Sequence, residues 1–256
     1  MSAFFAFFKK EWLESFRSGK LLFIGILFLA VGIMNPAIAK LTPWLLEMLS
    51  EELAESGMTV TAVTVDAMTS WTQFFKNIPL ALIAFLFLFG GIFTKEYETG
   101  TLLLTLTKGL SRYKVLIAKT AVLLSVYTIG YALCFGITYG YNAYFWDNGT
   151  VTGIFPAVFA FWLFGILVIM LSVFFSVVVR SYGGVLLGVG GSVIFFYLLS
   201  LIPKISKISP IGLIDSMPLL SGVKTLNDLL PCILVAVFLS AACLCVSIPI
   251  FRKKQL

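Results

Sequence analysis

Histidine is absent from all 256 residues of the sequence. Without it, the chain cannot form a Ser-His-Asp or Cys-His catalytic arrangement, an HExxH metal site or a His-ligated haem. Cysteine is scarce, and no two cysteines form a CxxC pair. This pattern argues against a zinc site or a disulfide framework. We interpret the cysteines as small apolar core residues, at Cys134, Cys232, Cys243 and Cys245.

Charge is also scarce, since only 12% of the residues are charged and 60% are hydrophobic. The mean hydropathy of +1.04 exceeds what a soluble domain of ordinary, roughly half-apolar composition would show. The sequence contains no G-x-x-x-x-G-K-[ST] pattern, and so lacks a P-loop for the phosphates of ATP. The composition therefore indicates a membrane protein with no ATPase site of its own.

Repeated apolar runs predict an all-α membrane protein with six transmembrane helices in a single transmembrane domain, residues 1–256. About 20 residues cross a hydrocarbon core of about 30 Å. The expected spans are about 21–39, 78–93, 115–145, 153–179, 185–202 and 232–250.

Two features qualify these spans, and two of the connections between spans are expected to contain helices. Asn35-Pro36 can kink or break the first one, and the third is long enough that part of it must break or project beyond the hydrocarbon. Between the first two spans, residues 43–56 are expected to form a short amphipathic helix within a polar segment, 40–77. The connection 203–231 contains four prolines and predicts short interfacial or re-entrant helices.

Residues 3–18 predict an amphipathic helix that lies in the plane of the membrane interface. Large aromatic residues, among them Phe8 and Trp12, recur at helical spacing, while Glu14 and Arg17 fall largely elsewhere. The alternative interpretation is a simple anchoring flank of the first span.

The distribution of basic residues predicts the orientation. Six spans place both termini on one side of the membrane. If that side is the cytoplasm, the cytoplasmic segments hold 13 of the 18 Lys and Arg residues. The positive-inside rule favours this arrangement, and it explains the basic net charge without nucleic acid. We expect cytoplasmic N- and C-termini, contact with membrane lipid and no nucleic-acid partner.

The stretch TKEYETGTLLLTLTKGLSRYKVLIAKT, residues 94–120, carries most of the charge between the second and third spans. Glu96 and Glu98 follow the second span, and Gly100 permits a sharp reversal. Thr99 or Thr101 can cap a following helix. That Leu- and Thr-rich helix would be too apolar to float free and too short to cross, so it must rest on headgroups or on a partner. The alternative is an interfacial loop whose basic residues only fix the topology.

The end of this stretch leads into the third span. Gly109 breaks the chain, and Ser111 and Arg112 precede the span, where we expect Lys119 to snorkel outward from about one turn inside. The whole stretch resembles the signature of bacterial ABC-2-type transporter permeases: an acidic E-x-G-T-L segment, a Leu/Thr run, a turn ending in Ser-Arg and a lysine opening the third span. The residues that carry the resemblance are Glu96, Glu98, Gly100, Thr101, Gly109, Ser111, Arg112 and Lys119. Gly109 stands where many relatives have proline.

This resemblance implies a function and a set of partners. In that family, the segment between spans two and three is a cytoplasmic coupling helix that docks on a separate ABC ATPase, beside the N-terminal interfacial helix. Glu96, Glu98 and Arg112 would be the polar contacts that transmit motion. Two ATPase copies would bind ATP and Mg, and a second permease subunit, identical or different, would complete the transporter. This chain would be a non-enzymatic subunit without a cofactor, in the bacterial plasma membrane.

The substrate remains open at the level of sequence. With no ionisable residue deep in a span, the spans offer apolar, aromatic and hydroxyl groups, which suit export of an amphipathic or hydrophobic substrate such as a peptide, a drug or a lipid-like molecule. The same absence argues against an ion-coupled secondary transporter. An ATP-independent protein, whether scaffold, immunity factor or secondary transporter, is the alternative, and co-purification of an ATPase distinguishes the two.

Overall fold

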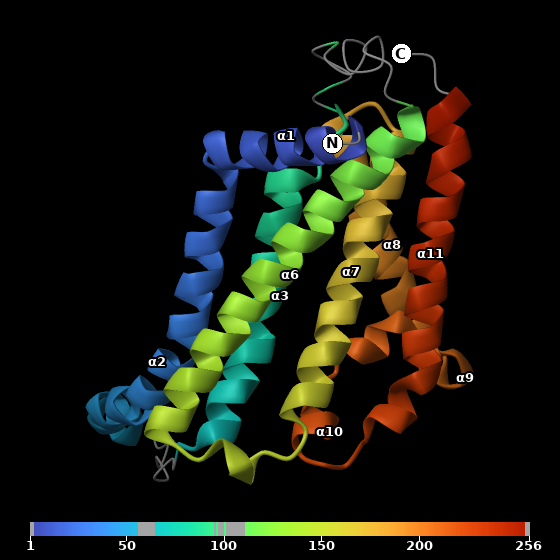
Figure 1. The fold of residues 1–256 in the computed structure, drawn as a ribbon. Helices are drawn as coiled ribbons and strands as arrows, with labels where there is room; N and C mark the ends of the chain where they lie inside the picture. Colours follow the sequence, from blue (N-terminus) through green and yellow to red (C-terminus); the bar gives the residue numbers. More distant parts are fainter. Residues whose placement is uncertain (1–2, 56–64, 95, 97–99, 101–110, 254–256) are drawn as a thin grey trace.

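The computed structural model describes residues 3–55, 65–94, 96, 100 and 111–253, and the description that follows concerns these residues alone. They form nine α-helices and short 3-10 turns, without a strand. Six of the helices are long and apolar enough to cross a membrane, as expected. Helix α1 (Ala3–Arg17) lies across one end of the bundle, where the last long helix of the chain also ends (Figure 1). We call this the α1 end, and the other the opposite end.

The six long helices carry the membrane-spanning segments. Four of them begin and end within three residues of the expected spans, and the first two differ. Their bounds are α2 Lys20–Glu55, α3 Ala67–Phe89, α6 Arg112–Phe145, α7 Ile154–Val178, α8 Tyr182–Ser200 and α11 Leu230–Lys253.

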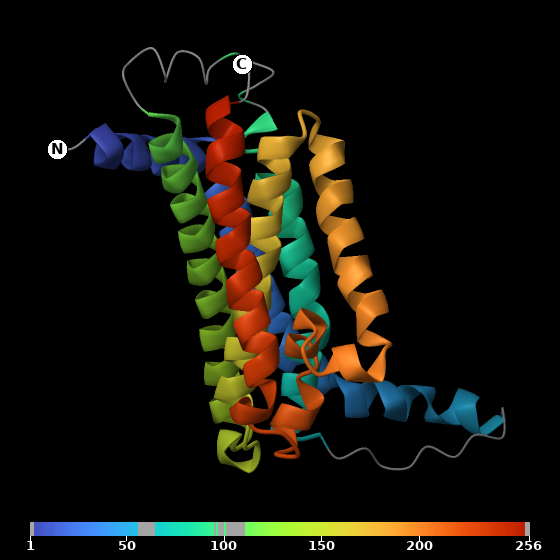
Figure 2. The ribbon, with the colours of Figure 1, turned by 90° about the vertical axis from the view of Figure 1, so that its right-hand side faces the viewer.

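Helix α2 joins the first span to the helix expected after it. The sequence allowed a kink or a break at Asn35-Pro36, and α2 continues without a break through Pro36 and Pro43 to Glu55. Its last part runs sideways at the opposite end (Figure 2). Each proline removes one ladder hydrogen bond, which lets the helix bend without ending.

Helix α3 begins eleven residues before the expected second span. Asp66 caps it, because its carboxylate accepts a hydrogen bond from the backbone N–H of Thr69 at 2.9 Å. The first turns bury Trp71, Phe74 and Phe75. A search for uninterrupted apolar sequence misses this part of the helix, because its polar residues alternate with large aromatic ones.

Helix α6 is unbroken over 34 residues. At 1.5 Å per residue it is about 51 Å long, well beyond a hydrocarbon core of about 30 Å. It crosses the bundle obliquely (Figure 1), so tilt and projection, rather than a break, accommodate the extra length.

The long helices pack as two groups. Helix α2 packs against α6 and α3, and α7 packs against α11 and α8. An aromatic cluster joins the groups: Tyr131 on α6 stacks on Phe161 of α7, with ring centroids 6.1 Å apart, and contacts Phe74 of α3 at 6.2 Å. Such ring contacts supply the packing that holds helices together in lipid, where hydrophobic burial gives no preference.

Buried polar groups tie α2, α3 and α6 together nearer the opposite end. Asn77 donates to Asn35 Oδ1 at 3.0 Å, and Asn35 donates to Thr138 Oγ1 at 3.4 Å. Thr138 in turn donates to the carbonyl of Gly32 at 3.0 Å. Interhelical hydrogen bonds of this kind fix the register of helices in a membrane.

Between α8 and α11 the chain forms short helical pieces at the opposite end, in agreement with the expectation for residues 203–231. A proline stands at the first or second position of each of the first three pieces, where its missing N–H has no helical partner to lose. Several of their leucines join the core. The pieces are α9 Pro203–Ser206, η2 Pro210–Leu213, α10 Met217–Leu220 and η3 Leu226–Leu229.

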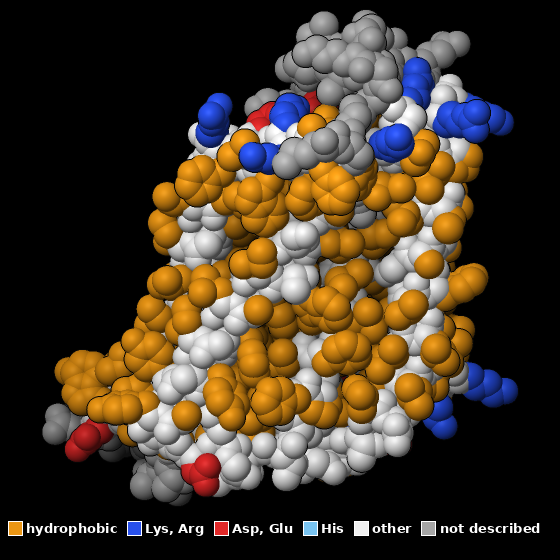
Figure 3. Space-filling model, viewed as in Figure 1, with side chains coloured by type: hydrophobic (Ala, Val, Ile, Leu, Met, Phe, Trp, Pro, Cys, Tyr) orange, Lys and Arg blue, Asp and Glu red, His pale blue; other side chains and the backbone are white. Residues whose placement is uncertain are grey.

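The surface carries an apolar band between charged ends. Figure 3 shows hydrophobic side chains over the middle of the molecule, Lys and Arg gathered at the α1 end, and acidic residues with a few basic ones at the opposite end. This pattern fits a multi-pass membrane protein.

Candidate functional site

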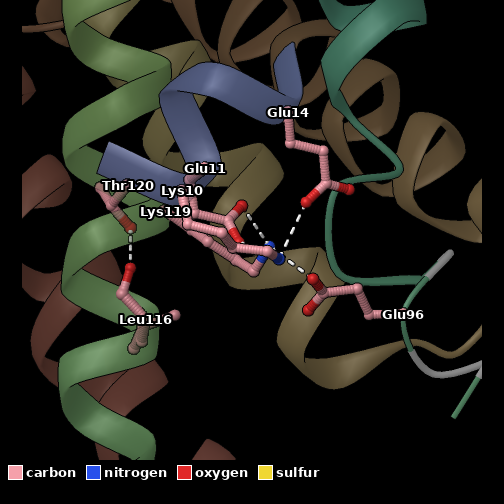
Figure 4. A network of polar contacts seen from close by, with 7 residues as sticks. All are labelled: Lys10, Glu11, Glu14, Glu96, Leu116, Lys119 and Thr120. Atoms are coloured by element: carbon pink, nitrogen blue, oxygen red, sulfur yellow. Dashed lines mark hydrogen bonds and ion pairs between the residues drawn. The ribbon is translucent and has the colours of Figure 1, made fainter. Parts of the chain in front are cut away.

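A buried ion-pair cluster joins three parts of the chain at the α1 end (Figure 4). Lys119 on α6 donates hydrogen bonds to Glu11 on α1 at 2.6 Å and to Glu96, which follows α3, at 2.9 Å. The side chains of Lys119, Glu11 and Glu96 are only 1%, 5% and 12% exposed. The Lys119 ammonium also lies 5.9 Å from the ring centre of Phe7 and 5.8 Å from that of Phe93. We call Glu11, Glu96 and Lys119 the Lys119 cluster.

The expectation that Lys119 snorkels outward is wrong. Helix α1 lies over the first turns of α6 and directs Glu11 toward it. The ammonium of Lys119 is therefore paired with a buried carboxylate and does not extend to the solvent. A buried ion is tolerated when its charge is paired and its hydrogen bonds are made. Removing one partner of such a group costs about 3–5 kcal/mol, so the cluster holds α1, α6 and the chain after α3 together.

The exposed side of α1 extends the network. Lys10 bridges Glu11 at 3.0 Å and Glu14 at 2.8 Å. Burial lowers the pKa of Lys10, but its bonds to Glu14 and Glu11 outweigh this, and the net pKa is raised. The hydrogen bond from Lys10 lowers the pKa of Glu14 below its usual range. The Glu14 side chain is mostly exposed at the edge of the network. Its ion pair with Lys10 therefore contributes less to stability than the buried pairs do.

The other two residues singled out on α1 lie outside the ion-pair network. Trp12 is half-buried and stacks on Phe8, with ring centroids 6.4 Å apart. Arg17 is exposed in the last turn of the helix. Glu11 and Phe7 form the inward face, so α1 has a buried side, an aromatic side and a charged side.

Glu96 is the electrostatically strained member of the Lys119 cluster. Burial raises its pKa, and Lys119 opposes that rise only in part. Its Oε2 atom is buried and has no hydrogen-bond partner among the described residues. A polar cavity of about 80 Å³, lined by Glu11, Glu14, Lys20 and Lys119 among others, adjoins it. This space is large enough for a water molecule that bonds this oxygen.

A second attachment lies where α6 begins. Arg112 donates from Nη1 to the backbone carbonyls of Phe251 at 3.3 Å and Arg252 at 3.2 Å, near the end of α11. Phe251 also makes an edge contact with Phe93, with ring centroids 5.6 Å apart. Carbonyls in the last turn of a helix lack helical partners and carry partial negative charge, so a guanidinium stabilises them. Ser111 is the N-cap of α6 but makes no side-chain cap hydrogen bond.

The chain between these two attachments is the charged stretch singled out in the sequence. Gly100 has φ +66°, a conformation that favours glycine and agrees with the expected reversal. The proposed coupling helix itself lies outside the described residues, as do Glu98, Thr99, Thr101 and Gly109. The described ends of the stretch are thus bound to α1 and α6 on one side and to α11 on the other.

Sequence reasoning missed Glu11 and the burial of Lys119. Glu11 is 108 residues from Lys119, and no local pattern pairs them. One signal was available: Glu11 lies one turn from Phe7 and Phe8, on the face of the helix expected to be apolar. An acid at such a position requires a cation from another element. Within the described part of the chain, no His, Cys, Asp and Glu side chains gather in a way that could hold a metal ion.

Comparison with known proteins identifies the family. Residues 5–247 match the sequence profile described as ABC-2 family transporter protein, which covers nearly the whole chain. No curated protein and no solved structure matches in the same comparisons. The six membrane-capable helices fit a transmembrane transport subunit. The chain therefore belongs to the ABC-2 family of transporter permeases.

Proposed function

We propose that this permease couples to a separate cytoplasmic ABC ATPase through residues 94–111 and exports an amphipathic or hydrophobic substrate. The observation that supports this most is the attachment of both ends of that segment. Glu96 is bound to Lys119 and Glu11, and Arg112 is bound to the end of α11.

Force applied to the segment has defined routes into the bundle. At its first end, Lys119 passes a displacement to α6, and Glu11 passes it to α1. At its other end, Arg112 links the start of α6 to α11. An ATPase that closes around ATP and Mg would pull on a segment anchored to two transmembrane helices and to α1. Coupling of this kind needs an element with two arrangements, which ATP binding on the partner would select.

In this proposal the residues of the segment divide into two groups. Glu96 and Arg112 are positioning residues, because their described contacts are within the permease. Glu98, Thr99, Thr101 and Gly109 would form or shape the surface that contacts the ATPase. Ser111 and Gly100 would set the turns at its two ends. Helix α1, with Trp12 and Arg17, would lie beside the docked ATPase as an interfacial helix.

The remaining parts of the proposal concern assembly and location. We propose two ATPase copies and a second permease, identical or different, in a bacterial plasma membrane with both termini in the cytoplasm. The excess of Lys and Arg at the α1 end supports this orientation (Figure 3). ATP hydrolysis would occur on the partner, since this sequence lacks a P-loop.

The test is purification of the tagged chain from its native cells in mild detergent, followed by mass spectrometry and an ATPase assay. A tagged, unrelated polytopic protein from the same cells is the control. We expect a stoichiometric P-loop ATPase with the permease alone. If none appears even after crosslinking in the cells, the coupling proposal fails, and an ATP-independent scaffold, immunity factor or secondary transporter takes its place.

A further inference from the structure

A carbon-lined cavity lies between α3, α7 and α8. Its volume is about 430 Å³, within the range of about 300–1,000 Å³ that small-molecule sites occupy. All of its described lining residues are apolar, among them Leu82, Phe161, Phe164 and Val193. Helix α8 contributes Gly190, whose missing side chain leaves the space unfilled.

A second cavity continues the first toward the opposite end. Its volume is about 560 Å³, and it shares Val193, Ile194 and Ile214 with the first cavity, so the two adjoin. Its lining adds Tyr197 and Asp215, which bring a phenol and a carboxylate to an otherwise apolar surface. We call the two together the α8 groove.

Asp215 is the charged group of this groove. Its side chain is exposed, and it belongs to no ion pair found among the described residues. The nearby connection contains Lys204 and Lys207, but neither of them lines either cavity. A carboxylate at one end of a carbon-lined groove attracts a positive charge and repels a negative one.

We propose that the α8 groove binds a hydrophobic cation, with its apolar part between α3, α7 and α8 and its positive charge beside Asp215. The site rests on the proposed transport function and narrows its substrate class. Charge complementarity decides against an anionic phospholipid as the occupant. The phosphate of its headgroup would meet the carboxylate of Asp215.

Helix α8 offers a matched pair of variants. Gly190 lines the cavity, whereas its neighbour Gly191 does not. A side chain added at either position meets no atom within 4 Å at its first carbon. Gly190→Leu should therefore fill the cavity, while Gly191→Leu makes the same change of residue on another face of the helix. For the charge, Asp215→Asn is matched by Glu47→Gln, which neutralises an exposed acid that lines neither cavity.

The probes are tritiated tetraphenylphosphonium and its anionic counterpart of similar shape, tetraphenylborate. Binding is measured by equilibrium dialysis on the full chain in zwitterionic lipid nanodiscs, with empty nanodiscs as background. We expect Gly190→Leu to weaken tetraphenylphosphonium binding by about tenfold or more, because the filled cavity no longer buries a phenyl ring. Asp215→Asn should weaken it by about fivefold, or about 1 kcal/mol, the upper end for an exposed ion pair. Both control variants should bind as the unchanged chain does.

Several results would overturn the site. If Gly190→Leu and Gly191→Leu weaken tetraphenylphosphonium binding equally, the cavity is not the binding site. If the anion and the cation bind equally well, the groove is an apolar site that a lipid chain fills. Loss of permease dimers in Gly190→Leu alone would assign the groove to a second copy. The binding assay uses the permease without its ATPase, and co-purification of the ATPase is a separate experiment. Failure of the groove to bind the cation therefore does not count against the coupling proposal, which fails only if the ATPase does not co-purify.

Discussion

Replacing Lys119 by methionine should destabilise the protein far more than loss of a surface lysine would. Methionine keeps an unbranched side chain but removes the charge, and it leaves the Glu11 and Glu96 carboxylates buried without their cation. Breaking a buried ion pair costs about 3–5 kcal/mol. At about 2–4 °C per kcal/mol for a chain near this length, the midpoint of thermal unfolding should fall by roughly 6–20 °C.

The assay is thermal unfolding in detergent, followed by intrinsic tryptophan fluorescence at one protein and detergent concentration. Lys9→Met is the matched control, because Lys9 is exposed on α1. A second variant, Glu11→Met with Lys119→Met and Glu96→Met, replaces all three charged groups by apolar side chains of similar length. Its midpoint should return to within a few degrees of the unchanged chain, since replacing a whole buried ionic group by apolar side chains is often nearly neutral.

Two results would refute this reasoning. If Lys119→Met and Lys9→Met lower the midpoint equally, the ammonium of Lys119 is solvated rather than buried. If the triple variant loses the sum of the losses of its single variants, the three residues act independently and do not form a cluster.

Other predictions follow from the same end of the molecule and from its orientation. Glu96 has a raised pKa in the folded protein, so the stability that its protonated form contributes is full below about pH 4.5 and is lost as the pH rises through the folded pKa. Gln does not titrate, so the unfolding midpoint of the unchanged chain minus that of Glu96→Gln should fall as the pH rises, and a pH-independent value would contradict this prediction. Arg112→Ala should leave the protein folded but reduce its stimulation of the partner ATPase by about tenfold, which corresponds to the loss of one contact of about 1.4 kcal/mol. Unchanged stimulation would show that Arg112 does not transmit motion from the segment to α11. In a Cys245→Ser background, an impermeant maleimide should label Glu47→Cys in intact cells and Arg17→Cys only after permeabilisation, and the reverse would invert the topology.

The transmembrane helices were predictable because membrane insertion depends on local composition. A run of apolar residues as long as Ile154–Val178 must form a helix in lipid, whatever surrounds it. The expected bounds of a span were wrong where aromatic residues pack inside the protein beyond the apolar run, as at Trp71 and Phe74 in α3. They were also wrong where a proline bends a helix instead of ending it, as in α2. Both outcomes depend on packing partners that the local sequence does not name.

The candidate site was predictable only as a segment. Its acids, glycines and terminal arginine are contiguous, so residues 94–112 stand out in an apolar chain. Their contacts are long-range: Arg112 reaches carbonyls near residue 252, and Lys119 reaches Glu11. The sequence shows that each charge needs a partner, but only the arrangement of α1, α6 and α11 shows which partner it has.

The charges of the Lys119 cluster should be needed for coupling even where they are dispensable for folding. Ion pairs fix α1 at one position over α6, whereas thioether groups would hold it more loosely. The triple variant Glu11→Met, Lys119→Met, Glu96→Met should thus recover its unfolding midpoint yet still show ATPase stimulation reduced by about tenfold or more. ATPase activity and unfolding are measured on the same preparation, with Lys9→Met as the control that keeps both. If the triple variant recovers stimulation together with stability, the cluster holds the fold alone, and force from residues 94–111 reaches the bundle by another route.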